Sequence, residues 1–186
     1  APVIVFDDAD IENALKVTSG FKFRNAGQVC ISPTRFYIHD NVYKDFIDGF
    51  TEITKSIKVG NGLDNDVQMG PLIDSRRLPV MEDFVSDAKD HGAKIQTGGH
   101  RIGNQGFFYA PTVLSEVPDK AKIMVEEPFG PLAPMTNFKT FDEVVERANS
   151  LPFGLAAYVF TSDGEKASKI EQALETGLVG VNHPMV

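Results

Sequence analysis

Short apolar runs alternate with amphipathic stretches along the chain of 186 residues. The apolar runs are rich in β-branched and aromatic residues, which favour strands; they cover residues 2–6, 34–39, 93–97, 112–114, 131–138, 156–161 and 178–181. The clearest amphipathic stretch has five apolar side chains at spacings of three or four residues, which predicts a helix with one buried face: Val42, Phe46, Phe50, Ile53 and Ile57.

Capping signals mark where further helices begin and end. Residues 8–10 (Asp-Ala-Asp) supply N-caps for one helix, and Asp74 is the expected N-cap of another. Residues 140–143 (Thr-Phe-Asp-Glu) form a capping box, and a last helix is expected over Asp163–Thr176. The alternation predicts one compact α/β domain, with a layered, mostly parallel sheet, helices on both faces and right-handed crossovers.

Charge and hydropathy exclude several classes of protein. Lys and Arg number 18 against 26 Asp and Glu, and no basic cluster occurs, so neither nucleic acid nor an anionic membrane is an expected partner. No apolar run approaches the roughly 20 residues that a membrane-spanning helix needs. A single unpaired cysteine agrees with the reducing cytoplasm, which is the expected location.

That cysteine, Cys30, is the main candidate for chemistry. One thiol cannot form a disulfide within the chain, so it is either a buried inert side chain or a nucleophile. The preceding residues 25–28 (Asn-Ala-Gly-Gln) suit a tight turn whose backbone N–H groups would stabilise a thiolate. No histidine stands in a recognisable relation to Cys30, so neither a papain-like pair nor a metal site is expected.

Two longer motifs carry a family resemblance. Residues 23–30 (Phe-Arg-Asn-Ala-Gly-Gln-Val-Cys) resemble the catalytic cysteine segment of the NAD(P)-dependent aldehyde dehydrogenase superfamily. Residues 126–131 (Glu-Glu-Pro-Phe-Gly-Pro) resemble the cofactor-facing loop of that family. Pro71 and residues 109–112, 153–156 and 180–182 also match, so the resemblance extends over essentially the whole chain. Three segments, residues 22–28, 70–74 and 129–134, are most similar to succinate-semialdehyde dehydrogenases.

The resemblance implies a role for each of four residues. Cys30 would attack the aldehyde to give a thiohemiacetal and then a thioester, with its backbone N–H in the oxyanion hole. Glu127 would bind the nicotinamide ribose of NAD or NADP, with the Phe129 ring beside it. Arg24 would contact the distal carboxylate of the substrate through its guanidinium fork. The last three residues each have a plainer alternative. Glu127 would be a solvated carboxylate, Phe129 a core ring, and Arg24 part of a surface or structural ion pair.

The resemblance also implies what lies outside these residues. The glycine-rich cofactor loop, the glutamate base and the asparagine of the oxyanion hole have no counterparts here, so residues 1–186 are expected to be the catalytic domain of a longer protein. That protein would be a homo-oligomer, dimeric or tetrameric, and these residues alone would be inactive. Succinate semialdehyde is the expected substrate, with glutarate semialdehyde, glycolaldehyde, lactaldehyde and a cofactor-independent thiol esterase as alternatives.

Overall fold

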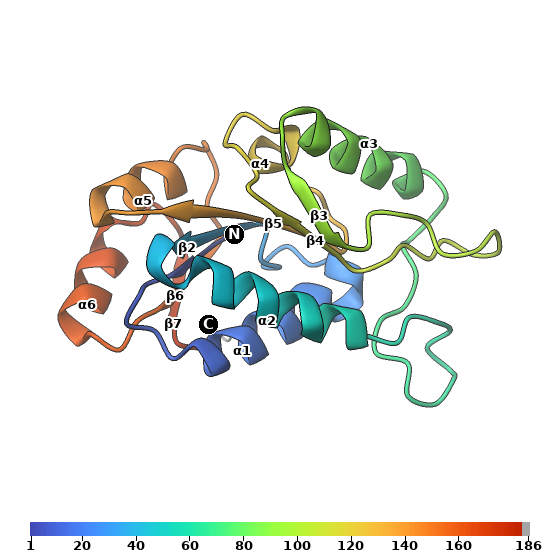
Figure 1. Ribbon diagram of the computed structural model, residues 1–186, viewed down its shortest axis with the longest axis horizontal. Coiled ribbons are helices and arrows are strands. Elements are labelled where there is room, and N and C mark those ends of the chain that lie inside the picture. Colours follow the sequence, from blue (N-terminus) through green and yellow to red (C-terminus); the bar gives the residue numbers. More distant parts are fainter. Residues whose placement is uncertain (184–186) are drawn as a thin grey trace.

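The computed structural model describes residues 1–183, in which seven strands form one sheet in the order β3-β4-β5-β2-β1-β6-β7 (Figure 1). The strands are β1 (Pro2–Val5), β2 (Arg35–His39), β3 (Lys94–Thr97), β4 (Thr112–Ser115), β5 (Leu132–Phe138), β6 (Ala156–Phe160) and β7 (Leu178–Val181). β3 pairs antiparallel with β4 at one edge, and the other neighbouring strands are parallel. This confirms the predicted fold class.

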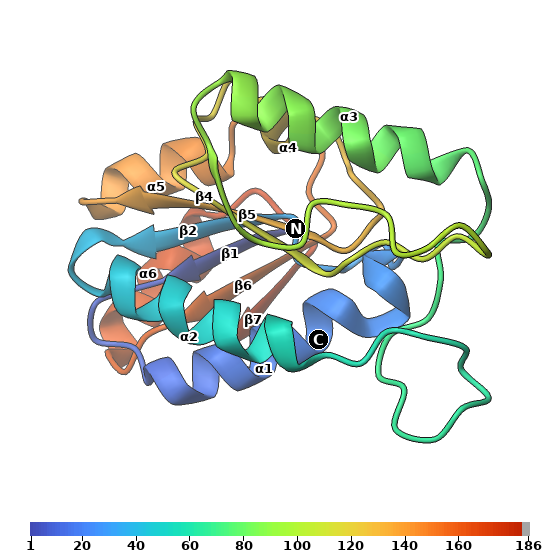
Figure 2. The ribbon, with the colours of Figure 1, turned by 45° about the vertical axis from the view of Figure 1, so that its right-hand side comes forward.

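Six α-helices are described between these strands: α1 (Ile11–Phe23), α2 (Tyr43–Ser56), α3 (Arg77–Asp90), α4 (Lys122–Val125), α5 (Phe141–Ala148) and α6 (Gly164–Ala173). Short 3-10 turns, η1 (Arg24–Gly27) and η2 (Asp40–Val42), follow α1 and precede α2. Figure 2 shows α1 and α2 running along the same side of the sheet.

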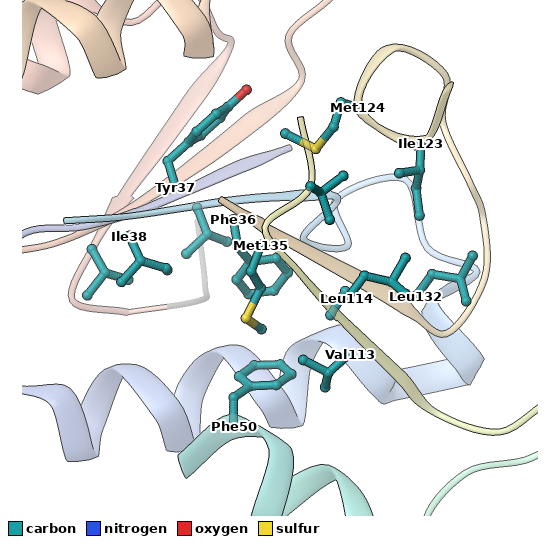
Figure 3. Packing of buried hydrophobic residues seen from close by; sticks show 14 of the residues in the cluster. Phe36, Tyr37, Ile38, Phe50, Val113, Leu114, Ile123, Met124, Leu132 and Met135 are labelled. Carbon is teal, nitrogen blue, oxygen red and sulfur yellow. The ribbon is translucent and has the colours of Figure 1, made fainter. Parts of the chain in front are cut away.

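Alternation along β2 explains why helices cover both faces. Successive side chains of a strand point to opposite faces. The Phe36 ring packs edge-on against Phe50 of α2, whereas the neighbouring Tyr37 points to the other side of the strand (Figure 3). The Tyr37 ring lies under the Arg147 guanidinium of α5. Because all three aromatic side chains are fully buried, both faces of the central strands belong to the core. The fully apolar, buried β1 is consistent with that position.

Two predicted helix boundaries were wrong. Asp74 does not cap α3 directly: its carboxylate accepts a hydrogen bond from the Arg76 backbone N–H in a turn, and α3 begins at Arg77. The last helix ends at Ala173 rather than at Thr176, because the Asn149 side chain bonds both the Ala173 carbonyl and the Glu175 N–H and so ends the helix. A side chain from another element thus decided the boundary.

Asp8 joins the carboxyl ends of β1 and β6. The crossovers leave the β1–β6 junction in opposite directions, and ligands of such sheets usually bind at that point. Here the Asp8 carboxylate, which follows β1, accepts hydrogen bonds from the Thr161 hydroxyl, the Ser162 N–H and the Lys166 ammonium, which follow β6. Although burial alone would raise it, the bonds from Lys166 and Thr161 hold the pKa of Asp8 below its ordinary value.

Candidate active site

The turn that leads to Cys30 has an unusual backbone. Asn25, Ala26 and Gly27 all have positive φ angles, of 52°, 54° and 70°. Only glycine adopts this region freely, and a non-glycine residue held in a sparsely populated region costs about 1–3 kcal/mol. Two bonds between Asn25 and Gln28 close the turn, because each side-chain amide donates to the backbone carbonyl of the other. The predicted tight turn is therefore present, and its amides hold it together.

The chain after Cys30 is anchored by side chains that the sequence did not reveal. The ammonium group of Lys22, at the end of α1, is fully buried and donates to the Pro33 carbonyl at 2.8 Å. The Tyr158 hydroxyl, from β6, donates to the Ile31 carbonyl at 2.8 Å. Burial, and to a smaller extent the nearby Cys30, raises the pKa of Tyr158, so the hydroxyl keeps its proton. The peptides on the carboxyl side of Cys30 thus have two fixed donors.

Cys30 itself is exposed, which contradicts the alternative of a buried inert thiol. No oxygen within residues 1–183 accepts a hydrogen bond from its backbone N–H. The thiol lines a cavity of about 270 Å³, which it shares with Glu126 and Glu127. The structure thus brings two residues together that are far apart in the sequence, Cys30 and Glu127.

This cavity lies at the amino ends of the parallel strands. Its walls include Pro2 at the start of β1, Arg35 at the start of β2, and Leu155 and Ala157 around the start of β6. Loops that enter strands therefore build the site, whereas loops that leave strands build the usual site of a doubly wound sheet.

The other two predicted site residues border separate hollows. The half-exposed Phe129 lines a hollow with Asn25, Gln28 and Pro71, on another side of the cysteine turn. Arg24 lines a hollow between α1 and α2. The turn of residues 24–30 therefore separates the cavity beside Cys30 from the two hollows, and its residues line all three.

Two further residues proved structural. Arg35 is buried and donates to the Tyr37 hydroxyl and the Ala148 carbonyl, which is a structural role. The Asn182 side chain bonds both the backbone N–H and the carbonyl of Thr161. These contacts link β7 to the end of β6 and do not reach the cysteine turn.

Among residues 1–183, no group of three or more His, Cys, Asp or Glu side chains is placed to hold a metal ion. In the same part of the chain, every helix is too short or too polar to cross a bilayer.

The model of the aldehyde dehydrogenase family matches residues 1–186. The chain belongs to this family. A probable succinate-semialdehyde dehydrogenase [NADP(+)] of Sinorhizobium fredii is 45% identical over 182 residues, covering 98% of this chain and 37% of the relative. A glutarate-semialdehyde dehydrogenase of Pseudomonas putida is 40% identical over 186 residues, covering 100% of this chain and 38% of the relative. The chain thus spans little more than a third of these relatives.

Solved structures of the aldehyde dehydrogenase family have the same fold. The crystal structure of succinate-semialdehyde dehydrogenase from Burkholderia pseudomallei superposes with a TM-score of 0.98 at 39% identity, over 100% of this chain and 39% of that one. Likeness at this level confirms the family that residues 23–30 and 126–131 suggested in the sequence.

The residues present fit the nicotinamide end of a dinucleotide. The Glu127 side chain is exposed and borders the same cavity as Cys30, and the Phe129 ring is half-exposed two residues further along. The cavity of about 270 Å³ is slightly smaller than the roughly 300–1,000 Å³ usual for small-molecule sites, so it is too small for a whole dinucleotide.

Proposed function

We propose that residues 1–186 are the catalytic domain of an NAD(P)⁺-dependent aldehyde dehydrogenase, with a cofactor-binding domain that lies outside them. The single observation that carries this proposal is the shared cavity of Cys30 and Glu127 in a chain of this family. The exposed thiol supplies a nucleophile, and the carboxylate supplies an acceptor for ribose hydroxyl groups.

The Cys30 thiolate would add to the carbonyl carbon of the aldehyde and form a thiohemiacetal. The oxygen of this adduct would meet the Cys30 backbone N–H, which has no acceptor within residues 1–183 and would stabilise the developing charge. NAD⁺ or NADP⁺, when bound, accepts the hydride that leaves the former carbonyl carbon. Hydrolysis of the resulting Cys30 thioester would then release the carboxylic acid and regenerate the thiol.

We infer that Arg24, which lines the hollow between α1 and α2, binds a distal carboxylate of a substrate whose aldehyde group reaches Cys30 across the turn of residues 24–30, which makes succinate semialdehyde the preferred aldehyde. Its guanidinium is exposed and has no hydrogen-bond or ion-pair partner among the described residues. It therefore meets a carboxylate without first breaking an internal bond. Two relatives support this substrate class, since both are named for semialdehydes that end in a carboxylate.

Replacement of the nucleophile tests the reaction. In the full-length enzyme, Cys30→Ala is expected to abolish NAD(P)⁺-dependent oxidation of succinate semialdehyde, while far-ultraviolet circular dichroism stays unchanged. An oxidation rate in Cys30→Ala equal to that of the wild type would refute the mechanism.

A cofactor-independent thiol esterase is the second candidate, because the exposed thiol would also accept an acyl group from an ester. The two candidates separate on two rates: oxidation of an aldehyde with NAD(P)⁺, and hydrolysis of an ester without any cofactor. We expect oxidation of the aldehyde whenever NAD(P)⁺ is present; ester hydrolysis in an enzyme that does not oxidise aldehydes with NAD(P)⁺ would favour the esterase.

A further inference from the structure

Three segments meet beside Cys30, and each of them contacts the other two. The first is the cysteine turn, residues 24–30; the second is the segment 71–77 before and at the start of α3; the third is the loop 126–130, which carries Glu127 and Phe129. No two of these segments are neighbours in the sequence.

The cysteine turn is joined to segment 71–77 through one side chain. The Gln28 side-chain oxygen accepts a hydrogen bond from the Ile73 backbone N–H at 2.8 Å, and its amide nitrogen also lies 3.4 Å from the Pro71 carbonyl. The cysteine turn also touches the loop 126–130 directly, since a Cβ at Gly27 would overlap the Gly130 carbonyl.

The contact between segment 71–77 and the loop 126–130 comes from Arg77, the first residue of α3. Its terminal nitrogen Nη2 donates to the Pro128 carbonyl and lies 3.4 Å from the Phe129 carbonyl. Burial lowers the pKa of this guanidinium, against the opposing effect of Asp74. The neighbouring Arg76 differs, because it is exposed and pairs with the Asp74 carboxylate.

The loop that Arg77 holds needs an external restraint. Phe129 has a φ of 39°, in the left-handed region that a bulky residue rarely adopts, and the residue is 38% exposed. Burial of the ring is therefore incomplete, and strained backbone of this kind persists only where surrounding contacts fix it. Gly130 follows with no room for a Cβ, since Met81 of α3 occupies that space.

We propose that Arg77 is a positioning residue that holds the Pro128–Phe129 backbone in this conformation and so fixes Glu127 and Phe129 for the cofactor. The proposal rests on the proposed function, since it takes those two residues as the cofactor contacts. Segment 71–77 then connects the loop that binds the cofactor to the turn that carries the nucleophile, through Arg77 on one side and Gln28 on the other.

The test compares Arg77→Met with Arg77→Lys and with the matched control Arg76→Met. Met keeps the unbranched apolar stem and removes the donors; Lys keeps a charged donor. In the 186-residue chain, Arg77→Met should lower the amide order parameters of Glu127, Phe129 and Gly130 measured by NMR relaxation, because the loop loses the donor that holds its carbonyl groups. Hydrogen exchange in β1 and β5 should stay unchanged, which shows that the domain is still folded.

In the full-length enzyme, Arg77→Met should raise the KM for NAD(P)⁺ about tenfold with kcat changed less than twofold. Arg77→Lys should recover part of the loss, and Arg76→Met should behave like the wild type. Unchanged order parameters at Glu127, Phe129 and Gly130, or an equal effect of Arg76→Met, would overturn the role of Arg77. A wild-type enzyme without NAD(P)⁺-dependent activity would overturn the proposed function instead, and the order parameters would still decide whether Arg77 restrains the loop.

Discussion

The backbone of Gly27 lies directly against the carbonyl group of Gly130, so closely that a Cβ atom at Gly27 would overlap the Gly130 oxygen. This contact brings the turn that carries Cys30 to the loop that carries Glu127. It also requires glycine for two reasons, the positive φ of 70° and the lack of space.

Gly27→Ala should therefore separate the two loops. We expect a loss of about 1–3 kcal/mol in unfolding free energy from strain and overpacking, and a marked fall in aldehyde oxidation by the full-length enzyme. Urea unfolding of the 186-residue chain and steady-state kinetics measure the two effects.

Gly103→Ala is the matched control. Gly103 also has a positive φ, of 63°, but a Cβ there would meet nothing within 4 Å. Gly103→Ala should therefore lose stability only through the strain of a positive φ at alanine, and its activity should be unchanged. Equal losses of stability and activity in the two variants would show that the Gly27–Gly130 contact has no effect of its own.

Gln28→Met should loosen the cysteine turn. The substitution removes the bond from the Ile73 N–H and the bond to the Asn25 carbonyl while keeping a side chain of similar length. Hydrogen exchange at the Ile73 amide should accelerate about tenfold, and kcat should fall by a similar factor.

Gln96→Met is the control for Gln28, because Gln96 also forms a side-chain hydrogen bond, to Ser115 at the edge of the sheet. It should affect neither measurement. Protection of the Ile73 amide that persists in Gln28→Met would contradict the link between the turn and segment 71–77.

Arg24→Ala should raise the KM for succinate semialdehyde at least tenfold, because a charged hydrogen bond to the distal carboxylate is lost. The KM for an uncharged aldehyde of similar length should change little. Lys16→Ala, which removes another cation at the same hollow, tests whether any nearby positive charge has the same effect. Equal changes in KM for both aldehydes in Arg24→Ala would refute a carboxylate contact.

Lys22 should make the stability of the domain depend on pH. Complete burial lowers its pKa to about 7 from an ordinary value near 10.5. Between these values the unfolded chain binds a proton that the folded chain has released, so stability rises with pH by up to about 1.4 kcal/mol per pH unit. Below pH 7 both states are protonated and the full penalty of burying the charge remains.

Lys22→Met removes this titration. The stability of Lys22→Met minus that of the wild type should therefore be greatest near pH 6 and should fall steadily towards pH 10. Urea unfolding across that range measures this difference. Lys16→Met, an exposed position on the same helix, should show no such trend. A Lys22→Met difference that is constant with pH would mean that the amine is not desolvated.

Residues 1–186 alone should bind NAD⁺ and NADP⁺ more weakly than micromolar, because the cavity beside Cys30 has room for only part of a dinucleotide. Isothermal titration calorimetry measures this directly. Micromolar binding by the 186-residue chain would show that these residues hold the whole cofactor.

The sequence by itself determined the order of strands and helices, the α/β class and the motif around Cys30. These features depend on short windows: apolar spacing buries one face of α2, and the Asp10 carboxylate caps α1 by accepting the Asn13 N–H. Local sequence failed at the end of α6, where the Asn149 side chain from another element sets the boundary.

Only the tertiary structure decided how the site is assembled. It placed the cavity at the amino ends of the strands, joined the carboxyl ends of β1 and β6 through Asp8, and brought Glu127 to the cavity that Cys30 lines. It also showed the donors that hold the two loops, Arg77 and Gln28. The physical reason is that these contacts join segments far apart in the chain, so their geometry exists only after the sheet and α3 have packed.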